Sequence, residues 1–219
     1  GNGAQPSGAS ETADGIGASV PRREDAALLT GHGRFIDDID LAGQLYASFV
    51  RSPYGHARVG TVDTQEAAAT PGVVAVLTGA DLAADGVGLM QAPASPVGKD
   101  GTPIHNPPQS AMTTDKARHV GDTVAMVVAE TRDAAQAAAE LVDVRWEELP
   151  CVTAAVDALD PQSPKVWDDL PSNVAVEWEM GDKAGVEDAF SRANHVTTLE
   201  LVNNRSVVAA LEPRGAFGV

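Results

Sequence analysis

The feature that most constrains the fold of this chain is a strand–helix–strand pattern that occurs twice. In the first copy, residues 57–63 (ARVGTVD) and 73–79 (VVAVLTG) have the short apolar runs of strands. Between them, Thr64 is a residue type that caps helices, and a Pro-Gly pair ends a short helix predicted over residues 65–69. This order is typical of folds in which helices cover a sheet.

The second copy is longer and more regular. Residues 123–130 (TVAMVVAE) predict a strand, Thr131 begins a predicted helix over residues 132–141, and residues 142–149 alternate apolar with charged side chains. Alanine dominates this helix, which favours helix formation and lets the helix lie close to a sheet. We expect both copies to pack as one layered α+β domain whose two helices cover a sheet.

Another strand is predicted over residues 44–52 (QLYASFVRS), ahead of the first copy. Apolar and polar side chains alternate along it, as in a half-buried strand. From this alternation we expect Leu45, Ala47 and Phe49 to face the core. The residues between them should then face solvent.

The end of the chain, after a Pro-rich connector, reads as the opening of a larger domain. A strand is predicted over residues 174–180, a helix over 185–193, and a hairpin from residues 195–203 and 206–211. A tail of this size is too short to close a core of its own. We therefore expect residues 174–219 to be the least stable part of the isolated chain.

Charge and cysteine content exclude several classes of function. The chain has 15 basic and 31 acidic residues, for a net charge of −16. Nucleic acids and anionic membranes attract clustered Lys and Arg, so neither is an expected partner. Cys151 is the single cysteine, so the chain forms no internal disulfide and holds no iron–sulfur cluster alone. The five histidines lack metal-site spacing, and no metal site is predicted.

The first 19 residues are rich in Gly, Ala and Ser and are predicted to form a flexible arm. They lack the basic start and apolar centre of a signal peptide. The rest of the sequence has no run that approaches the roughly 20 apolar residues of a membrane-spanning helix. These features predict a cytoplasmic protein without membrane insertion.

Glu212 is the one residue whose setting indicates a site. It follows the predicted strand 206–211, and because burial of an unpaired carboxylate costs several kcal/mol it should face solvent or a polar pocket. Pro213 fixes the backbone after it, and Gly215 permits close approach of another segment. An ion pair with Arg214 at the end of the strand is the competing interpretation.

Three long stretches resemble the molybdenum-binding large subunits of the xanthine dehydrogenase, aldehyde oxidase and carbon monoxide dehydrogenase family. They are residues 22–82 (RREDAALL to LTGADL), 115–150 (DKARHVGD to RWEELP) and 185–215 (GVEDAFSR to LEPRG). The resemblance implies an α/β hammerhead domain over residues 20–150, after the arm of residues 1–19. Residues 151–219 are then the first piece of the molybdopterin-binding domain.

The resemblance also implies a chemistry. Such enzymes oxidise an aldehyde, an N-heterocycle or carbon monoxide with water as the oxygen source. The complete subunit binds the molybdenum–molybdopterin cofactor, and iron–sulfur clusters and FAD lie on partner subunits or domains. Glu212 falls where purine-oxidising relatives carry a substrate-contacting glutamate. The family's cofactor loops and catalytic glutamate lie beyond residue 219, so no catalytic residue is expected in this chain.

Two alternatives to the role of a subunit piece stay open. One is a free-standing hammerhead module that serves assembly without catalysis. The other is a small-molecule binding domain that uses the Gly/Pro-rich loop of residues 83–112, which is longer than connections in compact domains usually are.

Overall fold

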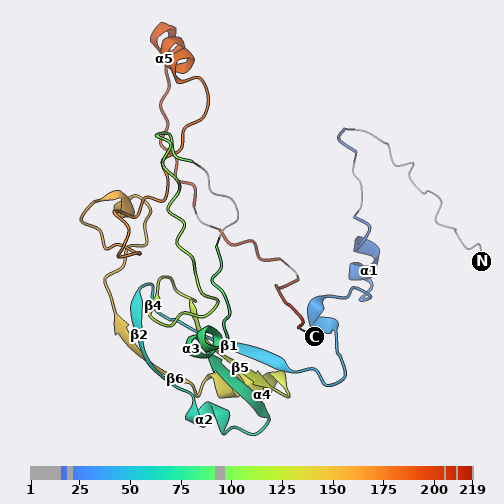
Figure 1. The fold of residues 1–219 in the computed structure, drawn as a ribbon. Coiled ribbons are helices and arrows are strands. Elements are labelled where there is room, and N and C mark those ends of the chain that lie inside the picture. The colour runs from blue at the N-terminus through green and yellow to red at the C-terminus, as the bar shows by residue number, and fades with distance from the viewer. Residues whose placement is uncertain (1–15, 19–21, 92–96, 205, 211, 219) are drawn as a thin grey trace, which may run out of the picture. The chain divides into compact units, whose positions relative to one another are not determined.

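The computed structural model describes residues 16–18, 22–91, 97–204, 206–210 and 212–218. The chain divides into two units, one formed by residues 1–42 with 201–219 and the other by residues 43–200. Each is described by itself (Figure 1). The first unit contains helix α1 (Asp25–Leu29) and the 3-10 helix η1 (Ile36–Asp38). All strands of the described chain belong to the second unit.

Six strands form two small antiparallel sheets in the second unit. They are β1 (Tyr46–Arg51), β2 (Ala57–Asp63), β3 (Val73–Thr78), β4 (Lys116–Ala117), β5 (Thr123–Ala129) and β6 (Asp143–Glu148). The first sheet has the order β1-β5-β3 and the second has the order β4-β2-β6. The helices are α2 (Gln65–Ala68), α3 (Gly79–Ala84), α4 (Arg132–Ala139) and α5 (Lys183–Arg192), with the 3-10 helix η2 (Asp157–Leu159).

Each predicted strand–helix–strand copy contributes to both sheets. In the first copy β2 joins the second sheet and β3 joins the first, whereas in the second copy β5 joins the first sheet and β6 the second. The expectation of one sheet is therefore wrong. The strands of one copy do not pair with each other, because each pairs with a strand of the other copy.

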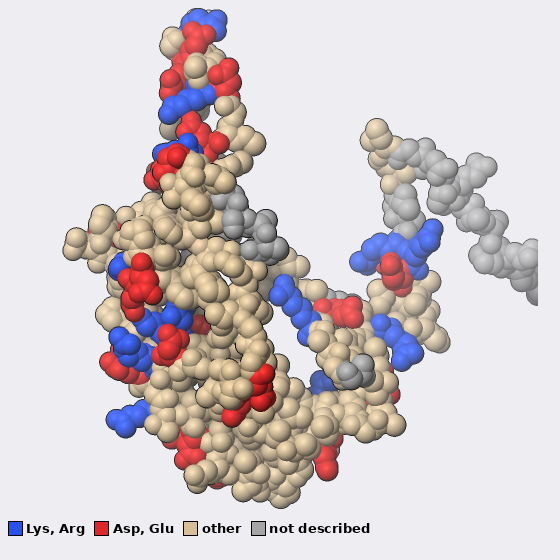
Figure 2. All heavy atoms as spheres, viewed as in Figure 1, with Lys and Arg blue, Asp and Glu red and all other residues tan. Residues whose placement is uncertain are grey.

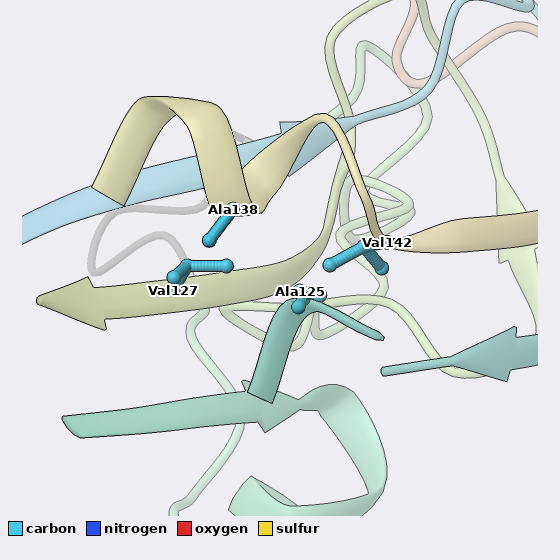
Figure 3. Packing of buried hydrophobic residues seen from close by; sticks show 5 residues of the cluster. Ala125, Val127, Ala138 and Val142 are labelled. Carbon is cyan, nitrogen blue, oxygen red and sulfur yellow. The ribbon is translucent and has the colours of Figure 1, made fainter. Parts of the chain in front are cut away.

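One core nevertheless unites the two copies, as expected. The cluster of buried residues consists of Ala67, Ala125, Val127, Ala138 and Val142. These come from α2, β5, α4 and the segment before β6, and Figure 3 shows α4 lying across β5 with Ala138 facing Val127. The small alanine side chains allow this close approach. The prediction of a single layered α+β domain is confirmed by this shared core.

The prediction of which face of β1 points to the core is wrong. Leu45 and Phe49 are about half exposed, and Val50 packs against the core cluster instead. The alternation itself is present, with Tyr46 and Ser48 on the more buried side. The first sheet has apolar residues on both faces, so hydrophobicity alone did not identify the covered face.

Of the two capping residues predicted from the sequence, only one caps its helix. Thr131 caps α4 as predicted, since its Oγ1 accepts a hydrogen bond from the Ala134 amide at 3.1 Å. Thr64 makes no side-chain cap on α2. The Asp63 carboxylate takes this role and accepts from the Gln65 amide at 3.0 Å.

The C-terminal stretch is less regular than predicted. Helix α5 confirms the predicted helix, and the Asp182 side chain caps it through the Gly185 amide. The prediction of a hairpin is wrong, because residues 195–204 and 206–210 have no strand structure. Residues 205 and 211 lie outside the described part of the chain. An extended segment becomes a strand only when another strand pairs with it.

The strand expected over residues 174–180 is also absent, although two of its carbonyl groups are used. Ala175 and Glu177 accept backbone hydrogen bonds at 2.9 and 2.8 Å from His105 and Lys99 of the long loop. None of the described helices is long and apolar enough to cross a lipid bilayer.

Candidate functional site

The predicted site residue, Glu212, lies against the 3-10 helix η1 within the first unit. The backbone N–H of Ile36 donates a hydrogen bond of 3.1 Å to Glu212 Oε1. Asp38 stabilises this helix, because its Oδ2 accepts a hydrogen bond from the Phe35 amide at 2.9 Å. The Glu212 side chain is therefore fixed at one oxygen, although the residue is exposed.

Gly215 brings the same segment close to η1, as the sequence predicted. A Cβ at this position would lie 2.8 Å from the Cδ1 and Cγ2 atoms of Ile36. Any larger residue would therefore force either the Ile36 side chain or the segment to move. Among the described residues, no ion pair joins Arg214 to Glu212, so the competing interpretation lacks its contact.

The residues around Glu212 do not make a cradle for a molybdenum cofactor by themselves. Within the described ranges, no three His, Cys, Asp or Glu side chains come together as a group that could hold a metal ion. In the part of the chain that the structure describes, two buried polar atoms lack a hydrogen-bond partner, His56 Nε2 and Arg118 Nε, and both belong to the other unit.

A second candidate, which the sequence did not indicate, lies in the second unit. Lys116 on β4 has a side chain that is only 5% exposed, and its ammonium group contacts the Asp168 carboxylate at 2.5 Å. Next to it, the Arg118 guanidinium lies 4.0 Å from the centre of the Trp167 ring, a cation–π contact. These two contacts fasten the connector to the second sheet.

Electrostatics at this cluster favour ionised carboxylates. The hydrogen bond from Lys116, followed by its charge, lowers the pKa of Asp168. Burial alone would raise the pKa of Asp115, but the hydrogen bond and charge of Arg118, together with hydrogen bonds from the Lys116 backbone and the Thr113 hydroxyl, outweigh this effect and lower it. Figure 2 shows that acidic and basic side chains of the described residues are also intermixed on the visible face of the molecule.

A cavity of about 440 Å³ opens beside the cluster. Its wall includes Lys116, Arg118 and Trp167, together with both ends of the long loop, residues 87–89 and 108–112. The two cations already pair with carboxylates, so they offer little unpaired charge to a ligand. The hypothesis of a small-molecule site on this loop stays a hypothesis.

Comparison with known proteins identifies the family to which this fold belongs. Residues 30–150 match the family described as aldehyde oxidase and xanthine dehydrogenase, a/b hammerhead domain. The chain belongs to this family. The hammerhead fold and the family resemblance drawn from the sequence are thereby confirmed.

Individual relatives extend the match beyond the hammerhead domain. The chain is 37% identical to the nicotine 6-hydroxylase large subunit of Paenarthrobacter nicotinovorans, over 92% of this chain and 24% of that protein. It is 34% identical to the carbon monoxide dehydrogenase large chain of Afipia carboxidovorans, over 85% of this chain and 23% of that protein. The chain thus spans about a quarter of the length of these curated relatives.

A solved structure gives the same result. The chain superposes on carbon monoxide dehydrogenase from Oligotropha carboxidovorans with a TM-score of 0.65 and 33% identity. The superposition covers 80% of this chain and 22% of that one.

The Lys116–Asp168 pair had no signal that sequence reasoning could use. The two residues are 52 positions apart, and Asp168 lies in a connector without periodicity. The dense charges around Lys116, in the stretch DKARH, would have indicated only a polar surface.

Proposed function

We propose that this chain is the N-terminal part of a molybdenum hydroxylase large subunit and is not active alone. The supporting observation is its 37% identity, over 92% of its length, to a large subunit of which it spans 24%. The rest of that subunit would bind the molybdenum–molybdopterin cofactor. Residues 20–150 are then the hammerhead domain, and residues 151–219 begin the molybdopterin-binding domain. Most of the arm predicted for residues 1–19 lies outside the described residues.

For the assembled enzyme we propose oxidation of an aldehyde, an N-heterocycle or carbon monoxide, with water as the oxygen source. Two relatives carry names that refer to nicotine and to carbon monoxide, which supports this range of substrates. Iron–sulfur clusters would be held by partner subunits or domains, since this chain has a single cysteine. FAD is likewise proposed to lie on partner subunits or domains. The assembly would act in the cytoplasm.

Glu212 is the residue that we propose contacts the substrate. Its Oε1 is held by the Ile36 amide, and no other described residue forms a hydrogen bond or ion pair with Oε2. A carboxylate that is fixed at one oxygen can accept a hydrogen bond from an N–H group of a heterocycle with the other. No residue of this chain is proposed to be catalytic.

Substitution of Glu212 in the assembled enzyme tests this role. Loss of a charge-assisted hydrogen bond to substrate costs about 1.5–3 kcal/mol, so Glu212→Gln should raise KM for an N-heterocycle about tenfold or more. Glu200→Gln, an exposed glutamate of the same tail, is the matched control and should leave KM unchanged. Equal KM values for both variants would exclude substrate contact by Glu212.

Assembly is tested separately by metal analysis. The 219-residue chain, purified alone, should contain no stoichiometric molybdenum, whereas the complete large subunit with its partners should contain about one molybdenum atom per copy. A complete, assembled subunit that lacks molybdenum and oxidises none of the three substrate classes would favour the scaffold alternative.

A further inference from the structure

The first sheet has an apolar face that the core does not use. Cross-strand pairing aligns two rows of side chains, Phe49–Met126–Leu77 and Ala47–Val128–Ala75. Side chains alternate between the faces of a strand, so both rows lie opposite Val127 and the helices that cover it. The sheet is therefore apolar on both faces.

This second face is only partly covered within the described chain. Phe49 is 47% exposed and Ala47 is exposed, while Met126, Val128 and Leu77 are partly buried. A charged group sits at the end of the rows, where the Arg51 guanidinium lies 5.4 Å from the Phe49 ring centre. Both rows themselves contain only apolar side chains.

The second sheet of the same unit shows what a solvated face looks like in this protein. Along β6, the exposed positions Asp143, Arg145 and Glu147 alternate with the less exposed Val144 and Trp146. Antiparallel sheets with one face in water show this alternation, whereas strands that are apolar on both faces are covered on both. Strand β5 is of the latter kind.

We propose that the two apolar rows of the first sheet are a docking face for the part of the large subunit that lies outside this chain. This inference rests on the proposed function. Related large subunits are about four times as long as this chain, so they supply ample further polypeptide. A covering segment from the same polypeptide needs no large area, since the translational entropy cost of association does not arise.

Other occupants fit the face less well. A stable interface between separate proteins uses about 20–30 residues on each side, and these rows provide six. A second copy of this chain would bring together two bodies of charge −16, whose repulsion opposes association. A partner subunit would need a surface much larger than these rows.

The test places a thiol on the face and measures its accessibility. Phe49→Cys is made in a Cys151→Ser background, and Val120→Cys, in an exposed turn of the same unit, is the matched control. Maleimide labelling rates are compared in the isolated chain, in the complete large subunit and in the enzyme with its partner subunits. Phe49→Leu in the complete subunit checks that the site tolerates a smaller apolar residue.

We expect both thiols to react quickly in the isolated chain. In the complete large subunit, before partner subunits are added, the Phe49→Cys thiol should react at least tenfold more slowly, while the Val120→Cys thiol keeps its rate. Protection that appears only with partner subunits, or that rises with concentration of the isolated chain, would overturn the proposal. So would an accessible thiol in every preparation.

Molybdenum content and turnover are measured in the same preparations. An active, molybdenum-containing enzyme with an accessible thiol refutes the docking face and leaves the proposed function standing. A protected thiol in a large subunit without molybdenum supports the docking face and contradicts the proposed function.

Discussion

Truncation of Val127 to alanine is the sharpest perturbation of the hammerhead core. Val127 is fully buried where β5 meets α4, and it belongs to the cluster that unites both strand–helix–strand copies. The substitution removes two methyl groups and introduces no polar atom. It therefore reports on packing alone.

The expected loss follows from two contributions. Two buried methyl groups at about 0.8 kcal/mol each contribute about 1.6 kcal/mol of lost transfer free energy. A residual void of about 40–50 Å³, at about 24 cal/mol per Å³, adds up to about 1 kcal/mol. We expect the free energy of unfolding to fall by about 2–2.5 kcal/mol.

Urea unfolding followed by far-ultraviolet circular dichroism measures this loss. Val120→Ala is the control, because Val120 is 66% exposed and its truncation should change stability by less than about 0.5 kcal/mol. Hydrogen exchange should show that Val127→Ala weakens protection in β2 and β6 as well as in β3 and β5. Weakening confined to one sheet would refute the single shared core.

Three further predictions concern other parts of the chain. Gly79→Ala should lower stability by about 1–2 kcal/mol in urea titrations, because the new Cβ would lie 2.7 Å from a backbone carbonyl oxygen, whereas Gly88→Ala, with no atom within 4 Å, should be neutral. Because the pKa of Asp168 is lowered in the folded protein, its carboxylate contributes stability above the unfolded pKa of 3.8, and this stability is lost as pH falls through the folded pKa. The melting temperature of Asp168→Asn should therefore fall less steeply below about pH 4 than that of the unchanged protein. Identical melting-temperature profiles against pH would contradict this. Residues 195–204 should exchange amide hydrogens faster than β5 in the isolated chain, and equal, slow exchange would contradict the absence of a strand ladder there.

Local signals in the sequence predicted local structure well. Thr131, followed by an alanine-rich run, predicted α4 and its cap, because both depend on residues within one turn. The same reasoning placed β2, β3, β5 and β6 to within a residue or two. Close approach at Gly215 was also predicted, since only glycine lacks a Cβ.

Features that depend on distant residues could not be predicted in this way. The covered face of β1 depends on which side α4 packs, and the apolar residues on both sides of the strand give no preference. The Lys116–Asp168 contact joins residues 52 positions apart. The predicted hairpin at residues 195–211 failed because apolar content indicates burial, and pairing needs a second strand in register.

Metal analysis of the native protein would show whether this sequence is part of a molybdenum enzyme. The protein that carries this sequence would be isolated from its source cells under native conditions with an antibody against the β5–α4–β6 region. Molybdenum and the copy number of this sequence would then be quantified together. We expect about one molybdenum atom per copy, in a complex that oxidises an aldehyde, an N-heterocycle or carbon monoxide. A native complex without molybdenum would contradict it.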